Sequence, residues 1–101
     1  MIPTSRNEFR ARMTESGVLP NLQGGIERYF FDRLRPGHFL TAVLSGDLFE
    51  TFARADDDSV GNLQALIRFL HNHTSGISHG TPGKVQDWLD DITTSVYLRE
   101  G

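Results

Sequence analysis

The chain has 101 residues, of which 38% are apolar and 23% are charged, and its formal net charge is −3. These values are typical of one globular domain with a single modest core, and they argue against wholesale disorder. The absence of cysteine excludes disulfides, thiolate metal sites and thiol nucleophiles. No apolar run approaches the roughly 18 residues of a membrane span. The N-terminus lacks the apolar stretch of a secretory signal, so we expect a cytoplasmic protein.

The charges are distributed unevenly along the chain. Up to Arg35, six arginines accompany four acidic residues, whereas the remainder carries four cations and nine acids. The simplest interpretation is a solvated surface, and the alternative is a molecule whose basic and acidic ends steer a charged partner. Nine of the ten cations are arginine, a residue that suits bidentate contacts and is enriched at interfaces.

Helix signals begin near the N-terminus. Ser5 is a suitable cap for a helix that runs to about Glu15, and Gly17 is suited to end it; the core-facing residues of this helix are Phe9 and Met13. Residues 17–25 contain proline, asparagine and two adjacent glycines, so we predict a loop there.

Two further helices are predicted before residue 47. One runs from about Gly25 to Leu34, and its inward stripe comprises Ile26, Tyr29, Phe30 and Leu34. Pro36 disfavours helix in the residue before it and is well placed to open the next helix, whose apolar residues are Phe39, Leu40, Val43 and Leu44. Gly46 suits the left-handed position after that helix.

The second half of the chain has three more helix signals. Asp47 and Glu50 have the spacing of a capping box, and the helix that they begin has an expected inward stripe of Leu48, Phe49, Phe52 and Ala55. The three aspartates at 56–58 are predicted to form a loop before a helix with the stripe Leu63, Leu66, Ile67 and Leu70. Thr81 and Pro82 are a strong start for a last helix, whose apolar face comprises Val85, Trp88, Leu89, Ile92 and Val96.

Strand signals are absent, because no stretch of five or more residues alternates apolar with polar side chains. The sequence therefore predicts an all-α protein, a compact bundle of five or six short helices. Residues 1–101 form a single helical domain, in which residues 1–24 are an N-terminal arm or helix followed by a loop.

No pattern of catalytic or metal-binding residues stands out. His71 and His73, with His79 nearby, offer three nitrogens, but residues two apart on a helix point about 200° from each other, and zinc would still lack a fourth ligand. The adjacent aspartates at 56–58 do not provide the alternating ligands of a calcium loop, and the serines lack the nucleophile-elbow pattern. We expect no catalytic residues, no metal and no cofactor, and hence a protein that is not an enzyme.

Nucleic-acid binding remains an alternative. The predicted helices on either side of Gly46 have the lengths of a helix-turn-helix. However, the second of them carries Asp47 and Glu50 and leads into three aspartates, with Arg54 as its cation, whereas a recognition helix is basic. An acidic helical face could instead imitate a phosphate array, so an acidic mimic of nucleic acid is also kept open.

Surplus aromatic residues are the most direct functional hint. Tyr29, Phe30 and Phe31 are consecutive, so Phe31 lies off the main stripe of its helix, and Phe69 lies off the stripe of its own. Such aromatics either fill a second core face or form a partner surface. For Phe31 we favour a partner surface surrounded by arginines, and the predicted partner-binding residues are Arg6, Arg10, Arg12, Arg28, Phe31, Arg33 and Arg35.

Two segments carry recognisable motifs. Residues 36–50 read PGHFLTAVLSGDLFE, with Ala-Arg-Ala-Asp at 53–56, and residues 80–88 read GTPGKVQDW after Leu-His-Asn at 70–72. Over about residues 25–90 the chain resembles a group of small phage and prophage proteins with the patterns Pro-x-x-Phe-Leu-x-Ala-Val-Leu-x-x-Asp-Leu and Gly-x-Pro-x-x-Val-x-x-Trp. The group has no assigned activity, and small phage accessory proteins are often inhibitors or adaptors of host proteins. The resemblance therefore implies a phage accessory protein that binds and inhibits a bacterial host protein, for host takeover or against a defence system.

Overall fold

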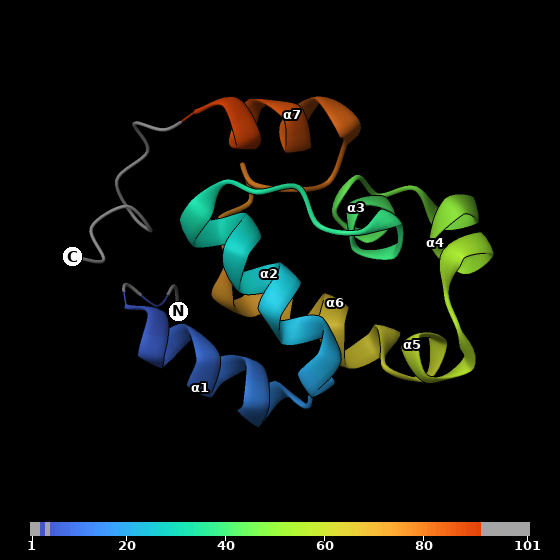
Figure 1. Ribbon diagram of the computed structural model, residues 1–101, viewed down its shortest axis with the longest axis horizontal. Helices are drawn as coiled ribbons and strands as arrows, with labels where there is room; N and C mark the ends of the chain where they lie inside the picture. The colour runs from blue at the N-terminus through green and yellow to red at the C-terminus, as the bar shows by residue number, and fades with distance from the viewer. Residues whose placement is uncertain (1–2, 4, 92–101) are drawn as a thin grey trace.

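The computed structural model describes residues 3 and 5–91, and all of their regular secondary structure is helical (Figure 1). The seven helices of these residues are α1 (Arg6–Ser16), α2 (Pro20–Asp32), α3 (His38–Leu44), α4 (Leu48–Arg54), α5 (Asp57–Gly61), α6 (Leu63–His73) and α7 (Pro82–Asp90). The predicted compact all-α fold is confirmed. In this part of the chain no helix is long and apolar enough to cross a membrane. Ile92 and Val96, predicted for the face of the last helix, lie outside the described residues.

The core is built around Phe9 of α1, which is completely buried. Its ring centroid lies 5.4 Å from that of Phe30 and 5.2 Å from those of Phe31 and Phe69. Tilted and edge-to-face ring pairs at this spacing add about 0.5–1.5 kcal/mol each beyond the burial of apolar area. Because these rings come from α1, α2 and α6, one aromatic cluster fixes the packing of three helices.

A second junction joins α7 to the end of α2. The indole N–H of Trp88 donates a 3.0 Å hydrogen bond to the backbone carbonyl of Tyr29, and the Tyr29 hydroxyl donates to the carbonyl of Ser78. The guanidinium of Arg33 lies 3.6 Å from the centroid of the indole ring and donates a 2.7 Å hydrogen bond to the Trp88 carbonyl. Arg33 reaches this position from a left-handed backbone conformation, with φ of 56°.

The predicted ends of several helices are confirmed. The side chains of Ser5, Asp47 and Thr81 each accept a hydrogen bond from the backbone N–H three residues further on, which satisfies a donor that the first helical turn leaves free. Gly17 and Gly46 follow α1 and α3 with φ of 87° and 72°. A Cβ on Gly46 would also collide with the backbone of the loop before α7, so glycine is required there twice over.

Two helix boundaries differ from the prediction. Helix α2 begins at Pro20 rather than near Gly25, because the proline occupies its first turn and Leu22 adds a buried contact there. The glycine at 25 lies within the helix, where a Cβ would be only 3.0 Å from the Leu40 side chain, so any other residue would require Leu40 to shift. Helix α3 begins at His38, two residues after the proline predicted to open it.

The three aspartates at 56–58 are not a loop, and this correction raises the number of helices to seven in the described residues. The Asp56 carboxylate accepts a 2.7 Å hydrogen bond from the backbone N–H of Ser59 and caps the single turn of α5. Asn62 ends α5 and precedes α6 directly. The Asn62 side chain also accepts from the Leu19 N–H and donates to the Gly17 carbonyl, which anchors this corner to the α1–α2 connection.

The predicted inward stripe of α4 is wrong. Leu48, Phe49 and Phe52 are 62%, 88% and 48% exposed, and Thr51 is the buried residue of this helix. The Thr51 hydroxyl donates to the backbone carbonyl at Asp47, so its polar group is satisfied inside the fold. Helix α4 therefore directs a threonine inward and its large apolar side chains outward.

Replacing the buried indole tests the α2–α7 junction. We expect Trp88→Ala to lower the free energy of unfolding by roughly 3–5 kcal/mol, because it removes a large buried ring and its contacts with Tyr29 and Arg33. Trp88→Phe keeps a ring and should cost clearly less. Denaturant unfolding followed by circular dichroism measures both, and a loss below about 1 kcal/mol for the alanine variant would contradict this packing.

Candidate functional site

The arginines of α1 hold α1 against α2. Arg6 forms ion pairs of 2.9 Å with both Glu27 and Asp32, and Arg10 contacts Glu27 at 2.6 Å. Arg12 pairs with Glu15 on its own helix at 2.6 Å. The three arginines of the N-terminal arm are thus paired with acidic residues of the same molecule. The pairs formed by Arg6 and Arg10 stabilise the contact between α1 and α2.

These pairs lower the pKa of the α2 carboxylates. Hydrogen bonding to Arg10, and then to Arg6, holds the pKa of Glu27 below its ordinary value of 4.5, and hydrogen bonding to Arg6 does the same for Asp32 relative to 3.8. The two carboxylates also raise the pKa of Arg6. The network therefore favours the charged forms of all its members.

The other predicted partner-binding residues do not form one surface. Phe31 is 6% exposed and its ring packs edge-on against Phe9, so the prediction of an exposed aromatic anchor is wrong. Arg33 is 8% exposed beneath α7, which corrects its placement on a partner surface. Arg28 and Arg35 are exposed, and Arg35 donates a 2.9 Å hydrogen bond to the side chain of a residue in α7. The physical reason is that α2 touches two neighbouring helices and buries a second face.

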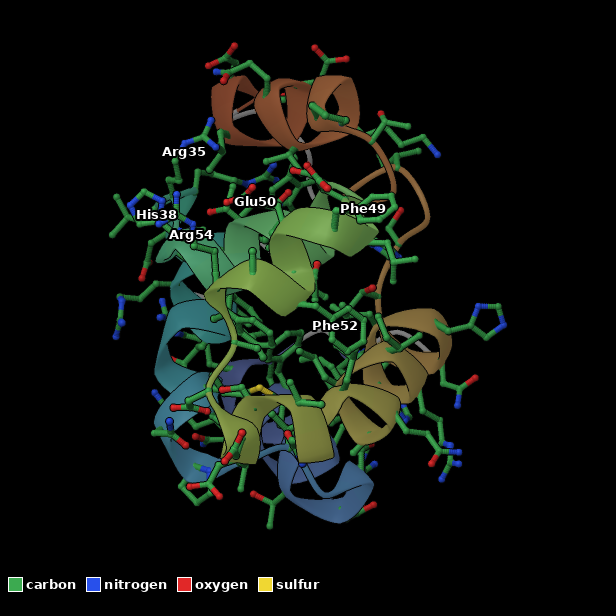
Figure 2. All side chains as sticks on the ribbon, turned by 90° about the vertical axis from the view of Figure 1, so that its right-hand side faces the viewer. Arg35, His38, Phe49, Glu50, Phe52 and Arg54 are labelled. Carbon is green, nitrogen blue, oxygen red and sulfur yellow. The ribbon has the colours of Figure 1, made fainter. Side chains whose placement is uncertain are left out.

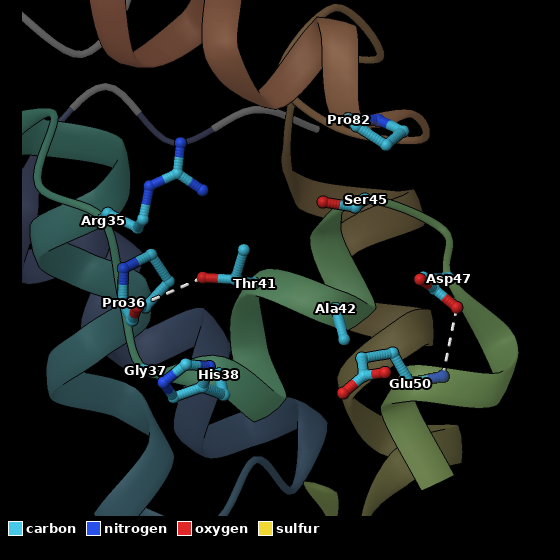
Figure 3. A pocket seen from close by; sticks show the side chains of 10 residues that line it. All are labelled: Arg35, Pro36, Gly37, His38, Thr41, Ala42, Ser45, Asp47, Glu50 and Pro82. Atoms are coloured by element: carbon cyan, nitrogen blue, oxygen red, sulfur yellow. Dashed lines mark hydrogen bonds between the residues drawn. The ribbon is translucent and has the colours of Figure 1, made fainter. Parts of the chain in front are cut away.

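A polar cleft of about 440 Å³ lies where the α2–α3 connection, α3, the start of α4 and the start of α7 meet (Figure 3). Most of its polar groups already form hydrogen bonds within the protein. The Thr41 hydroxyl donates to the Pro36 carbonyl at 3.1 Å, and the Asp47 carboxylate accepts from the Glu50 N–H at 3.0 Å. In the described residues around this cleft, no hydrogen bond joins a hydroxyl to a histidine or carboxylate.

A serine–histidine contact occurs elsewhere, in the loop before α7. The Ser78 hydroxyl lies 2.9 Å from Nδ1 of His79, and burial lowers the pKa of that histidine. The same hydroxyl donates to the carbonyl of Ser75, and Ser78 has no exposed surface. The contact is therefore structural. Among residues 3 and 5–91, no three histidines or acids converge as a metal site.

The most distinctive surface is an apolar face between α4 and α6. It comprises Leu48, Phe49, Phe52, Leu63 and Ile67, and we call it the α4–α6 face. Figure 2 shows Phe49 and Phe52 on the side of α4 nearer α6, whereas Arg54 points to the other side. Ile67 is 48% exposed although α6 was predicted to bury it. Monomeric proteins rarely expose contiguous apolar patches larger than roughly a few hundred Å², and larger patches mark interaction sites.

A narrow slot runs into this face. It has a volume of about 170 Å³ and is lined by Val43, Gly46, Leu48, Thr51, Leu63 and Ile67. The lining is almost entirely apolar, and cavities of roughly 150 Å³ hold a benzene ring in other proteins. The slot is therefore suited to one leucine or phenylalanine side chain from a partner.

Sequence reasoning missed this surface although it named every residue in it. The spacing of Leu48, Phe49 and Phe52 predicts one apolar helix face, but the same spacing is found in core helices and in binding helices. The length of the helix gives no signal either, because α3 also has seven residues and buries Leu40, Val43 and Leu44.

Comparison with protein-family models, with curated proteins and with solved structures finds no match for this chain. The functional argument accordingly depends on the residues and the geometry described above.

Acidification tests the α1–α2 ion pairs. A carboxylate whose pKa is lowered in the folded state contributes stability above its ordinary pKa and loses that contribution as the pH falls through the lowered value. We therefore expect the free energy of unfolding to fall between pH 7 and pH 3, and to fall less in Glu27→Gln. Denaturant titrations at both pH values measure this difference.

The matched control is Glu15→Gln, which removes the exposed carboxylate of the pair within α1. It should retain the pH dependence of the unaltered chain. The same loss of stability on acidification in Glu27→Gln as in the unaltered chain would contradict the role given to this network.

Proposed function

We propose that this protein is a phage-encoded, non-enzymatic accessory protein that binds a bacterial host protein and inhibits it through the α4–α6 face. The observation that carries the proposal is the exposure of Phe49, which is 88%, beside Leu48 and Phe52 at 62% and 48%. Folding gives no reason for these residue types at those positions, because a polar side chain at each would leave the core unchanged.

Binding to a partner does explain large apolar side chains at these exposed positions. Interface hot spots are large side chains that lose water on contact, surrounded by groups that exclude solvent. Burial of apolar area contributes about 25 cal/mol per Å², so covering two phenylalanines and three aliphatic residues is a substantial driving force. The slot beside Leu48 and Ile67 gives that surface a concavity for a partner side chain. The α3–α4 turn, in which Asp47 caps α4, holds the helix in place.

The polar cleft supports the same proposal indirectly. Its carboxylates and the Thr41 hydroxyl are engaged in a helix cap, an ion pair with Arg54 and a backbone hydrogen bond. These bonds lie at the start of α3 or within α4 and stabilise each helix, which suits a scaffold that presents α4 to a partner. The resemblance to small phage proteins supports the origin of the protein and the class of its partner.

Capture from a lysate of the host bacterium tests the proposal. We expect Phe49→Ser to retain the melting temperature within a few degrees, because the side chain is exposed, and to lose at least about tenfold of the captured partner, as truncated hot spots do. Quantitative mass spectrometry of the proteins that co-purify measures the loss.

The matched control is Leu34→Ser. Leu34 was predicted to face inward, but it is 53% exposed just past the end of α2, so the substitution removes a comparable apolar side chain from another surface. The control should capture the same partner as the unaltered chain. Equal capture by all three proteins, or no specific partner at all, would contradict the proposed function.

Nucleic-acid binding is the second candidate, and a basic edge favours it. Arg35, His38 and Arg54 lie on the side of the molecule away from the apolar face (Figure 2). However, Arg54 is paired with Glu50 at 2.7 Å, and Asp56 lines the same hollow as His38 and Arg54. These acids weaken the field that a phosphate backbone would meet.

Electrophoretic shifts test the second candidate. We expect no shift of a labelled duplex or single strand at physiological salt, because few cations on this edge are free of acidic neighbours. Titrations at low and physiological salt provide the measurement. A tight shift that weakens steeply with salt, and that Arg35→Ala reduces, would reverse the ranking of the two functions.

A further inference from the structure

The α4–α6 face has a depression on each side of a row of side chains. Leu63 and Ile67 are four residues apart on α6 and therefore lie one above the other along the helix. They line the slot on one side, together with Leu48 and Thr51, and they line a shallow apolar hollow of about 490 Å³ on the other. Two depressions thus flank one row of side chains.

A helix can pack against a surface of this shape. Helices pack by fitting a row of side chains from one helix into the grooves beside a row of the other. A partner helix can place one apolar side chain in the slot and another in the hollow, so that residues from two neighbouring rows of its own surface lie on either side of the ridge formed by Leu63 and Ile67.

The rim of the hollow carries a cation, Arg68. Arg68 and His71 line it, and no residue of α6 between Leu63 and His73 is acidic. No carboxylate of the described part of the chain pairs with Arg68. On α4, by contrast, Glu50 and Arg54 neutralise each other at 2.7 Å. Within the described residues, the apolar face is therefore bordered by a cation that has no acidic partner, and the net charge of the whole chain is −3.

We infer that the segment of the partner that covers the α4–α6 face is an acidic amphipathic helix. Its apolar side chains occupy the slot and the hollow, and its glutamates or aspartates face Arg68 and His71. The inference rests on the proposed function and adds the chemistry of the partner. Complementary charge at the edge of an apolar contact selects the partner and sets the orientation of the helix.

A displayed peptide library tests this chemistry without knowledge of the natural partner. The probes are synthetic 16-residue helices with leucine or phenylalanine fixed at i, i+4 and i+7, and with glutamate, glutamine or lysine varied at the flanking positions. On the unaltered protein we expect enrichment of glutamate over lysine of at least tenfold. On Arg68→Glu the preference should reverse, and on Ile67→Asp no peptide should be enriched.

The matched control for charge is Arg28→Glu, because Arg28 is exposed on α2 and lines a different hollow. This variant should select the same glutamate-rich peptides as the unaltered chain. The dissociation constant of the best peptide, measured by fluorescence anisotropy, should rise at least tenfold with Arg68→Glu and remain unchanged with Arg28→Glu.

Several outcomes would overturn the inference. Equal enrichment of glutamate and lysine, or no enriched peptide, would mean that the face does not select acidic helices. A dimer in light scattering that Ile67→Asp abolishes would mean that a second copy of this chain covers the face. Failure here is distinguishable from failure of the proposed function, because host-protein capture that depends on Phe49 can persist without any preference for glutamate.

Discussion

Helix α2 is held between α1 on one side and α7 on the other, and this double contact decides which of its side chains are buried. On the first side, Phe31 packs edge-on against Phe9 while Arg6 lies 5.0 Å from the Phe31 ring centroid. On the second side, Trp88 donates to the backbone of α2 and Arg33 covers its indole ring at 3.6 Å. Because α2 is packed on both sides, its aromatic residues are not available to a partner. Helix α4 packs against α3, and its large apolar side chains are exposed.

The packing of the helices also divides the arginines into two groups. Arg6 and Arg10 are close to Glu27 because α1 lies along α2, and their charges are used to hold those helices together. Arg68 is on the exposed side of α6, where no acid of the described chain reaches it. A count of arginines alone therefore says little about binding, because the packing of the helices decides which cations are already paired.

The α4–α6 face links the fold to the proposed function. Its position depends on the α3–α4 turn, where Gly46 fits against the loop before α7 and Asp47 caps α4. A rigid turn keeps Leu48 beside the slot and Phe49 in solvent, so a partner meets a surface that is already formed. Preorganised surfaces of this kind bind with less loss of conformational freedom than flexible ones.

The sequence by itself determined six of the seven helices in the described residues and those helix ends that are set by a capping residue, because such signals depend on neighbouring residues. Ser5, Asp47 and Thr81 cap their helices through backbone groups three positions away, and Gly17 adopts a conformation that disfavours other residues. The helical periodicity also identified Phe9 and Trp88 as core residues. Such local signals act within one or two turns of helix, and the tertiary structure leaves them unchanged.

Only the tertiary structure decided which apolar face each helix buries. Phe31 and Phe49 are both phenylalanines on short amphipathic helices, and their spacing predicts an interface residue for the first and a core residue for the second. The structure reverses both, with exposures of 6% and 88%. Periodicity shows that a helix has an apolar face, but burial depends on the number of neighbours that the chain brings against that helix. Helix α2 has neighbours on two sides, whereas the outer side of α4 has none in the described part of the chain.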